Sequence, residues 1–410
     1  MKYILIIGDG MADNPVPELG GKTPLDYANI PTIDSLAAKG VVGSMKNCPD
    51  DLPAGSDTAI TSIFGCDPHT YYTGRAPLEA AADGLRLKAG DIAYRCNMVC
   101  YEDGDMAWES KRILSHSAGS IEGDESNAII TALFADPEFK AAAEKAGMSV
   151  NPGGSFRHIA VQSGAEAKGM KLIPPHDHLG EVIGPLLPTG SDNAAVLLSL
   201  MKLAYEKLNH HPLNESRRSR GKMPANGIWF WAEGTAVELP NFEARFGHRG
   251  GVISAVPLCH GIAALTGLEP VHVPGATGEL ETNLEGKVEA VMATLETYDF
   301  AAIHVEAPDE CTHNGDLPGK LQAIEWLDSR VTKPLLTMLE AKGWDYRILM
   351  LSDHKTLTAT RGHDGTPVPF LLYDSTVDTG AGSRYCESDG EKGPYYPVGA
   401  ESCMKLLFDV

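Results

Sequence analysis

The sequence has few basic residues for its number of acidic ones. Lysine and arginine total 34 and aspartate and glutamate total 55 among 410 residues, which gives a formal net charge of −21. Binding to nucleic acid or to an anionic membrane depends on clustered positive charge. We therefore expect no nucleic acid and no membrane as a partner. A phosphorylated substrate would need positive charge concentrated at one site, as arginines or as metal ions.

The chain also lacks paired cysteines and long apolar runs. Its eight cysteines include no CxxC pair, so the sequence indicates neither a disulfide framework nor a structural zinc site. No segment approaches the roughly 18 apolar residues of a membrane span, and the initial run YILII is too short for a signal peptide. These features predict a cytoplasmic protein.

Three short, apolar, β-branched runs end in acidic residues or histidine, as is typical of buried parallel strands. They are YILIIGDG at 3–10, FAAIHVEA at 300–307 and RILMLSDH at 347–354. Three other segments repeat apolar residues at helical spacing. These are 31–40, 286–298 and 319–343. Together they predict an α/β fold with a mostly parallel sheet flanked by helices.

The middle of the chain differs from both ends, because it has its own turns rich in proline and glycine. We predict a discontinuous core domain of residues 1–84 and 236–410, with a second domain of residues 85–235 inserted into it. The basic stretch ESRRSRGKMP at 215–224 is expected to be a polar loop with solvated arginines.

Several candidate metal ligands follow the predicted strands. The carboxyl ends of parallel strands meet at one edge of a sheet, which is where ligands bind, so Asp9, Asp353 and His354 are expected in one site. Asp309 and His313 lie four residues apart, a spacing that places both side chains on one face of a helical turn. Each motif alone is more often a cap or a surface pair, but their common placement favours a metal site.

His363, in a glycine-rich turn, completes a set of three carboxylates and three imidazoles. Oxygen and nitrogen donors in this number suit two divalent ions, with Mn²⁺ expected and Mg²⁺ or Zn²⁺ as alternatives. Ser56, in the stretch GSDTA, would be a seventh donor. Its position before a short helix is that of an ordinary N-terminal cap. Beside two cations, the same hydroxyl would be a nucleophile suited to phosphoryl transfer.

Substrate recognition is expected from arginines, whose planar guanidinium pairs with phosphate or carboxylate through two hydrogen bonds. Arg95 and Arg157 each follow an aromatic residue in a short β-like run and are the leading candidates. His158, His176 and Asp177 are expected to support them from the inserted domain.

Several motifs in combination resemble the archaeal-type branch of the cofactor-independent phosphoglycerate mutases, in the alkaline phosphatase superfamily. The resemblance extends from residue 2 to the C-terminus. The motifs are DGMAD (9–13), PAGSDTA (53–59), YYTGRAPLEA (71–80), YRCN (94–97), HVEAPDECTHNGD (304–316), SDH (352–354) and TPVPF (366–370). The family usually has a lysine where this chain has His260.

This resemblance implies an alkaline phosphatase-like core with an inserted α/β domain that captures substrate. It implies one ion held by Asp309, His313 and His363, and a second ion held by the ligands Asp9, Ser56, Asp353 and His354. It also implies transient phosphorylation of Ser56 and adds Arg75 to the substrate-binding residues.

The implied reaction is the interconversion of 3-phosphoglycerate and 2-phosphoglycerate, with a small phosphorylated metabolite as the partner and the oligomeric state left open. One alternative is a phosphotransferase of the same family acting on another small hydroxy acid, such as a homoserine kinase-like enzyme; a phosphatase-like hydrolase is another. The absence of a GxxxxGK[ST] motif counts against an ATP-dependent kinase. A pure binding module would need neither seven metal donors nor a nucleophile.

Overall fold

The computed structural model describes residues 1–380, 382–398 and 402–409. The chain divides into two compact units: unit 1 comprises residues 1–72 and 238–410, and unit 2 comprises residues 73–237. Unit 2 therefore begins at Thr73 rather than near residue 85. The reason is that helix α5 (Arg75–Ala82) packs on strands β3 (Ile92–Tyr101) and β7 (Gly227–Thr235) of unit 2.

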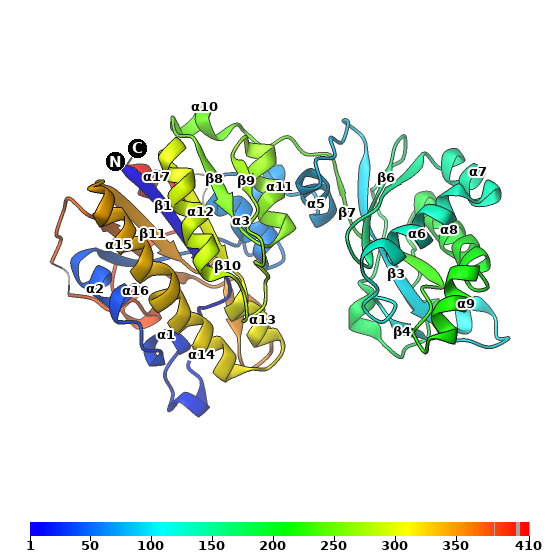
Figure 1. The fold of residues 1–410 in the computed structure, drawn as a ribbon, viewed down its shortest axis with the longest axis horizontal. Coiled ribbons are helices and arrows are strands. Elements are labelled where there is room, and N and C mark those ends of the chain that lie inside the picture. Colours follow the sequence, from blue (N-terminus) through cyan, green and yellow to red (C-terminus); the bar gives the residue numbers. More distant parts are fainter. Residues whose placement is uncertain (381, 399–401, 410) are drawn as a thin grey trace. The chain divides into compact units, whose positions relative to one another are not determined.

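Unit 1 is built on an eight-stranded sheet with the order β15-β2-β14-β11-β1-β10-β8-β9 (Figure 1). Its central strands, β11, β1, β10 and β8, run parallel, while β14 is antiparallel to both of its neighbours. The strands are β1 (Lys2–Gly8), β2 (Val41–Met45), β8 (Gly250–Ile253), β9 (Glu269–Val271), β10 (Phe300–Val305), β11 (Tyr346–Leu351), β14 (Val368–Asp374) and β15 (Tyr395–Tyr396). The predicted mostly parallel sheet is confirmed.

Helices flank this sheet, as the apolar spacing predicts, and α12, α14 and α15 cross in front of the strands in Figure 1. The helices of unit 1 are α1 (Pro24–Tyr27), α2 (Pro31–Lys39), α3 (Ser56–Ile63), α4 (Pro68–Tyr71), α10 (Phe242–Phe246), α11 (Pro257–Thr266), α12 (Leu284–Thr297), α13 (Ala307–His313), α14 (Leu317–Trp326), α15 (Lys333–Lys342), α16 (Glu387–Gly390) and α17 (Ser402–Phe408). A short 3₁₀ helix, η1 (Pro17–Leu19), and a π-helical turn, η5 (Leu327–Thr332), complete the set.

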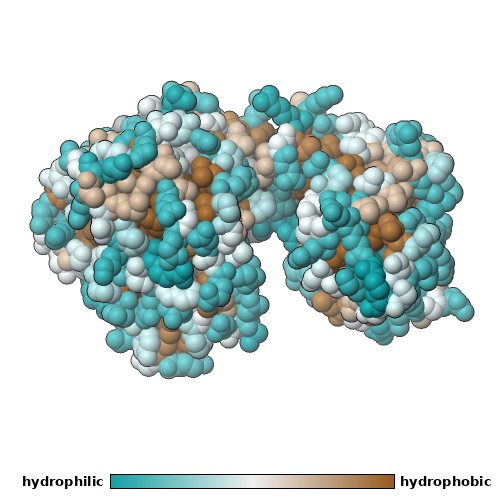
Figure 2. Space-filling model, viewed as in Figure 1, coloured by the Kyte–Doolittle hydropathy of each residue, from teal (hydrophilic) through white to brown (hydrophobic). Residues whose placement is uncertain are grey.

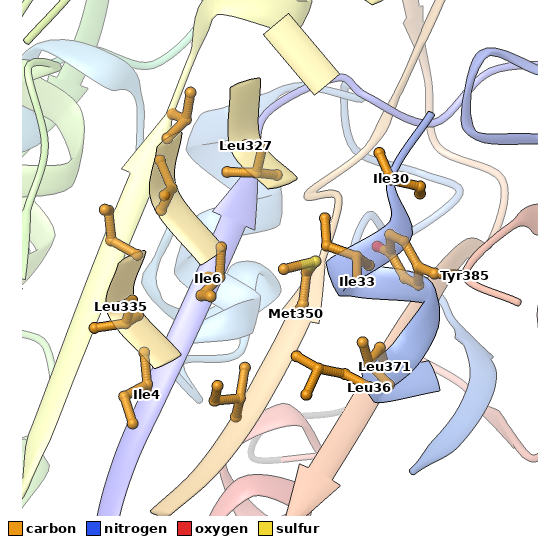
Figure 3. Close-up of a cluster of buried hydrophobic side chains, with 14 of the residues drawn as sticks. Ile4, Ile6, Ile30, Ile33, Leu36, Leu327, Leu335, Met350, Leu371 and Tyr385 are labelled. Atoms are coloured by element: carbon orange, nitrogen blue, oxygen red, sulfur yellow. The ribbon is translucent and has the colours of Figure 1, made fainter. Parts of the chain in front are cut away.

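The main core of unit 1 lies between the sheet and one layer of helices. Alternate residues of β1, Ile4 and Ile6, are fully buried and point into this core, where Leu327 and Leu335 also lie (Figure 3). Side chains from α2 and β11, including Ile33 and Met350, extend the same cluster. Burial of this apolar surface fixes the strands, and therefore also fixes the polar residues that follow them.

Unit 2 has its own antiparallel sheet, ordered β4-β3-β6-β5, with β7 also paired to β3. The strands other than β3 and β7 are β4 (Ile113–Ser115), β5 (Met148–Asn151) and β6 (Arg157–Gln162). Its further helices are α6 (Gly123–Ala135), α7 (Pro137–Lys145), α8 (Asp192–Leu208), α9 (Pro212–Ser219), η2 (Trp108–Ser110), η3 (Pro175–His178) and η4 (Gly184–Leu186). A separate core of buried residues, including Trp229 and Leu197, holds this unit together.

The expected polar loop at 215–224 is wrong. Residues 212–219 form α9, which has Pro212 in its first turn, and the ring of His211 accepts the Leu213 amide at its start. Arg217 is not solvated: it is 2% exposed and forms an ion pair with Glu125 of α6.

In Figure 2, hydrophilic residues cover much of the visible face of each unit, with patches of hydrophobic residues between them.

Candidate active site

The polar residues predicted at the strand ends lie together in unit 1. Asp9 follows β1, while Asp353 and His354 follow the adjacent strand β11, and all three are about 1% exposed. Gly10, with φ of 60°, donates its amide to Asp353 Oδ1 at 3.1 Å. A Cβ at Gly10 would lie 2.3 Å from Thr356 Oγ1, so only glycine permits this close approach.

Helix α13 adds the next pair. Asp309 and His313 lie one turn apart on it, with 3.2 Å between Asp309 Oδ2 and His313 Nε2. His363 comes from the hairpin of β12 (Lys355–Leu357) and β13 (Gly362–Asp364), and its Nε2 is 3.3 Å from Asp309 Oδ1. The predicted i,i+4 arrangement on one helical face is therefore present, and Asp309 contacts both imidazoles.

The three imidazoles share one orientation. Each Nδ1 faces a backbone carbonyl: His313 that of Arg361 at 2.8 Å, His354 that of Lys355 at 3.2 Å, and His363 that of Ala54 at 3.2 Å. An Nδ1–H that donates to a carbonyl leaves Nε2 of a neutral ring with its lone pair. All three Nε2 atoms therefore point toward the buried carboxylates, which is the orientation of imidazole ligands around a cation.

The Nε2 atoms of His313 and His363 are only 2.9 Å apart. Two lone pairs at this distance repel each other unless a proton or a cation lies between the rings. In the metal-free protein, the hydrogen bond to Asp309 raises the pKa of His313 to about 9. Burial lowers the pKa of His363, but its hydrogen bond to Asp309 outweighs burial and raises it overall. A proton on His313 and a metal ion would therefore compete for the same nitrogen.

Two carboxylate oxygens of the cluster lack a hydrogen-bond partner within the described part of the chain. Asp9 Oδ1 and Asp353 Oδ2 are buried and have no hydrogen-bond partner among the described residues. Burial, and then the charge of Asp353, raises the pKa of Asp9 well above its usual value. Burial also acts to raise the pKa of Asp309, but the hydrogen bonds from His313 and His363 lower it well below that value. Buried carboxylates at this density require compensating positive charge.

Within the part of the chain that the structure describes, two groups of three acidic or histidine side chains have ligand atoms that all lie within 4.8 Å of one another. The first comprises Asp309, His313 and His363, and the second comprises Asp9, Asp309 and His354. The first is the set that the sequence predicts for one ion. The second group contains Asp309, whereas the ligand set implied by the resemblance for the second ion contains Asp353. The donors are three imidazole nitrogens and buried carboxylate oxygens, and two of these oxygens, Asp9 Oδ1 and Asp353 Oδ2, have no hydrogen-bond partner among the described residues. Such a donor set fits divalent transition-metal ions.

Ser56 lies at the same place, and its hydroxyl does not cap a helix. It is the first residue of α3, Gly55 occupies the N-cap position, and no side chain caps this helix. The Ser56 hydroxyl lies 3.2 Å from Asp9 Oδ2 and 3.2 Å from His354 Nε2. The alternative of a plain helix cap is therefore wrong, because the hydroxyl is directed at the candidate ligands.

Three neighbours of the cluster are not among the predicted site residues. Thr356 donates its hydroxyl to Asp309 Oδ1 at 2.6 Å, and Lys320, which is fully buried, donates to the Thr356 carbonyl at 2.6 Å. His304, at the end of β10, lies 2.9 Å from Asp9 Oδ2 through its Nε2. His304 could have been predicted as a site residue, because it lies at the polar end of the strand run FAAIHVEA. No local sequence pattern indicates that Thr356 contacts the site.

In unit 2, three predicted arginines surround one carboxylate. Arg95 donates through Nε to Glu79 at 2.8 Å and Arg75 donates to it at 3.1 Å. Against burial, which raises the pKa of Glu79, Arg95 lowers it to about 2. Burial and the nearby Arg95 lower the pKa of Arg157 to about 10, and its buried Nε has no hydrogen-bond partner among the described residues. Three guanidinium groups beside one carboxylate leave an excess of positive charge.

The remaining predicted residues of unit 2 differ in their surroundings. His158 is fully buried, and its ring nitrogens face the Ser126 hydroxyl at 3.1 Å and the Gly153 amide at 2.9 Å. Both ring nitrogens of His158 therefore have partners within unit 2, and its part in substrate binding stays a prediction. His176 and Asp177 are exposed on η3, where the His176 ring lies 5.1 Å from that of Trp231.

His260, where the resemblance expects a lysine, belongs to unit 1. It is 3% exposed on α11, and its ring packs against that of His272 with 4.0 Å between centroids. Burial lowers the pKa of His260 to about 4. A neutral imidazole therefore replaces the positive charge that a lysine would bring.

Among the described residues, all eight cysteines are buried and free, and no helix is long and apolar enough to cross a bilayer.

Comparison with known proteins identifies relatives over the whole chain. A family model described as 2,3-bisphosphoglycerate-independent phosphoglycerate mutase matches residues 37–214. A relative of that name from Methanosarcina acetivorans is 42% identical over 411 residues, covering 100% of both chains. Another of that name, from Methanothrix thermoacetophila, is 40% identical over 409 residues and covers 99% of both.

Two solved structures are also similar along the full length. A protein from Pyrococcus horikoshii has a TM-score of 0.78 and 29% identity, covering 100% of this chain and 97% of its own. The cofactor-independent phosphoglycerate mutase from Thermoplasma acidophilum has a TM-score of 0.64 and 25% identity, covering 100% of this chain and 99% of its own.

Proposed function

Because this chain belongs to the 2,3-bisphosphoglycerate-independent phosphoglycerate mutase family, whose members are isomerases, we propose that it interconverts 3-phosphoglycerate and 2-phosphoglycerate through a phosphoserine on Ser56. The observation that carries the proposal is the position of the Ser56 hydroxyl, 3.2 Å from both Asp9 Oδ2 and His354 Nε2. Starting a helix does not require a serine to contact a buried carboxylate and an imidazole, as Ser56 does.

We further propose that the site holds two divalent ions, with Mn²⁺ as the metal and Mg²⁺ or Zn²⁺ as alternatives. Asp309, His313 and His363 would hold one ion. The second would be held by Asp9, Ser56, Asp353 and His354, with Asp309 close enough to contribute. Bound there, the ions would lower the pKa of the Ser56 hydroxyl and neutralise phosphoryl oxygens.

The reaction then consists of two transfers at Ser56 Oγ. In the first, Oγ bonds to phosphorus as the bond from phosphorus to the 3-oxygen breaks; Ser56 loses its proton and the departing oxygen gains one. In the second, the 2-hydroxyl of the retained glycerate loses its proton and bonds to phosphorus, while Ser56 regains a hydroxyl. Each step is an ordinary displacement by an activated nucleophile, and 2,3-bisphosphoglycerate is not required as a cofactor.

The arginines of unit 2 are proposed to bind the anionic groups of the substrate. Arg157 is the strongest candidate, because its buried Nε faces no partner among the described residues while Arg95 and Arg75 crowd it with like charge. A phosphate or carboxylate would relieve that repulsion and accept paired hydrogen bonds. Arg95 is already held by Glu79 and stacks on Trp231, with 4.7 Å from its guanidinium to the ring centroid. Arg75, His176 and Asp177 complete the proposed set.

The deciding experiment incubates purified protein with Mn²⁺ and 3-phosphoglycerate and follows the formation of 2-phosphoglycerate, with Ser56→Ala as the control. A parallel reaction supplies ATP and homoserine and follows phosphohomoserine. Formation of 2-phosphoglycerate by the natural protein, and not by Ser56→Ala, supports the proposal. Turnover of homoserine alone would assign the same nucleophile to a different acceptor, and release of free phosphate alone would make the protein a phosphatase.

A further inference from the structure

The end of strand β10 carries a buried histidine that has no role in the two transfers proposed above. His304 is 2% exposed, and each of its ring nitrogens faces a polar side chain. Its Nε2 lies 2.9 Å from Asp9 Oδ2, and its Nδ1 lies 3.2 Å from the Ser254 hydroxyl. Ser254 is itself 1% exposed. The three side chains therefore form a buried chain that ends on a candidate metal ligand.

Strand register explains why these residues meet. Strands β8, β10 and β1 are adjacent and parallel, with Ile253 paired to Ile303 and His304 paired to Ile7. Ser254 immediately follows Ile253, and the Asp9 amide donates to the Val305 carbonyl at 2.9 Å. The three polar residues thus form a row across the carboxyl edge of the sheet. Lys287 of α12 donates to the His304 carbonyl at 3.0 Å and fixes the end of β10.

Nε2 of His304 donates to Asp9 in each protonation state that these contacts allow. Ser254 Oγ accepts the Val256 amide at 3.0 Å. Burial lowers the pKa of His304, but interactions with Cys259, Glu306 and Asp353 raise it overall. A charged ring donates through both nitrogens, whereas a neutral ring with its proton on Nε2 accepts the Ser254 hydroxyl at Nδ1. Asp9 Oδ2 also faces the Ser56 hydroxyl, whereas Asp9 Oδ1 is buried without a hydrogen-bond partner among the described residues.

We propose that His304, oriented by Ser254, is a positioning residue: it holds Asp9 by Oδ2 and thereby presents Oδ1 to the metal ion. The proposal rests on the metal centre described under the proposed function. Without the bond from His304, Asp9 Oδ2 would keep only the longer contact with the Ser56 hydroxyl, at 3.2 Å, so the carboxylate would be held less firmly and the metal would have to fix it on binding. Partners behind a ligand typically change metal affinity about 10–100-fold when removed.

The opposing explanation is that His304 only fills buried space, in which case its loss would lower stability and leave metal affinity unchanged. Unit 2 supplies a matched control. There the Ser126 hydroxyl lies 3.1 Å from Nε2 of the fully buried His158, the same kind of Ser···His contact with none of the seven candidate ligands involved. Ser126→Ala should therefore cost a similar buried hydrogen bond while leaving the metal centre intact.

The test titrates Mn²⁺ into metal-stripped, full-length protein by calorimetry and compares natural protein, Ser254→Ala, His304→Ala, His304→Gln and Ser126→Ala. Thermal unfolding of each metal-free protein measures stability separately. We expect His304→Ala to weaken Mn²⁺ binding about 10–100-fold, Ser254→Ala to weaken it less, and His304→Gln, whose amide can still donate to Asp9, to retain most of it. Ser126→Ala should bind as the natural protein does, whatever its melting temperature.

Unchanged Mn²⁺ affinity in Ser254→Ala and His304→Ala would overturn the proposal, and so would losses of affinity in all four variants that simply follow their melting temperatures. If His304→Ala does not fold, the comparison of Ser254→Ala with His304→Gln still tests the proposal, because Mn²⁺ binding should weaken in the first variant and be mostly retained in the second. Natural protein that binds Mn²⁺ without mutase activity would overturn only the proposed substrate. Natural protein that binds none of Mn²⁺, Mg²⁺ and Zn²⁺ would overturn the metal centre and this inference with it.

Discussion

Raising the pH should strengthen Mn²⁺ binding to the metal-stripped protein, because His313 must lose a proton before it can bind a metal. Its Nε2 lies 3.2 Å from Asp309 Oδ2, and this hydrogen bond raises the pKa of His313 to about 9. At pH 7 the ring is therefore charged, and each metal ion that binds there displaces a proton.

The size of the effect follows from this linkage. While His313 is charged, affinity should rise about tenfold for each pH unit, or about 1.4 kcal/mol, and should level off as the pH approaches the pKa. From pH 7 to 8.5 the total is on the order of 30-fold. The pKa of His363, which Asp309 raises against the effect of burial, should steepen the dependence at the lower end of this range.

The assay is anaerobic calorimetric titration of Mn²⁺ from pH 6.5 to 8.5, in pairs of buffers with different ionisation enthalpies so that released protons are counted directly. His313→Asn removes the titrating ring, so its affinity should be weaker overall and its slope lower by about one decade per pH unit. An affinity of the natural protein that did not change between pH 7 and 8.5, with no proton released, would refute this reasoning.

Prolonged chelation should abolish turnover, and Mn²⁺ should restore it; full activity in protein shown by elemental analysis to be metal-free would contradict the metal centre. Arg157→Met should raise the KM for phosphoglycerate at least tenfold with little change in melting temperature, since the buried Nε of Arg157 has no hydrogen-bond partner among the described residues, and steady-state kinetics checks this; an unchanged KM would remove Arg157 from the site. Acid should destabilise unit 2, because Arg95 holds the pKa of Glu79 at about 2 against a usual 4.5. The stabilisation is complete above pH 4.5 and is lost as pH falls toward 2, at a cost of about 3 kcal/mol; Glu79→Gln, followed by denaturant unfolding, should lack this component.

Most of the metal centre could be predicted because its residues follow short local patterns. Asp9, Asp353 and His354 each come directly after a buried strand, and parallel strands bring such residues to one edge. Asp309 and His313 are one helical turn apart, so their shared face needs no tertiary information. The fold class followed from the same runs, since their apolar content matches a sheet buried on both faces.

Long-range contacts decide what local patterns left open, including the choice between a helix cap and a nucleophile for Ser56. The direction of the Ser56 hydroxyl depends on Asp9 and His354, which are 47 and 298 residues away in the chain. His304 contacts Asp9 across 295 residues. Burial of Arg217 in α9 depends on Glu125, 92 residues earlier, so the charge-rich segment gave the wrong indication of a solvated loop. Strand register and side-chain packing decide such pairings, and neither is encoded in a local pattern.

The central claim is that Ser56 carries the phosphoryl group between the two positions of glycerate. The direct measurement is to quench the Mn²⁺-loaded protein with acid during turnover of ³²P-labelled 3-phosphoglycerate and to locate the label by peptide mass spectrometry. The account predicts phosphate on Ser56, none in Ser56→Ala, and turnover lost in that variant while its metal-free stability changes by less than about 1 kcal/mol, since no helix cap is removed. Label on a histidine, or an active Ser56→Ala protein, would contradict it.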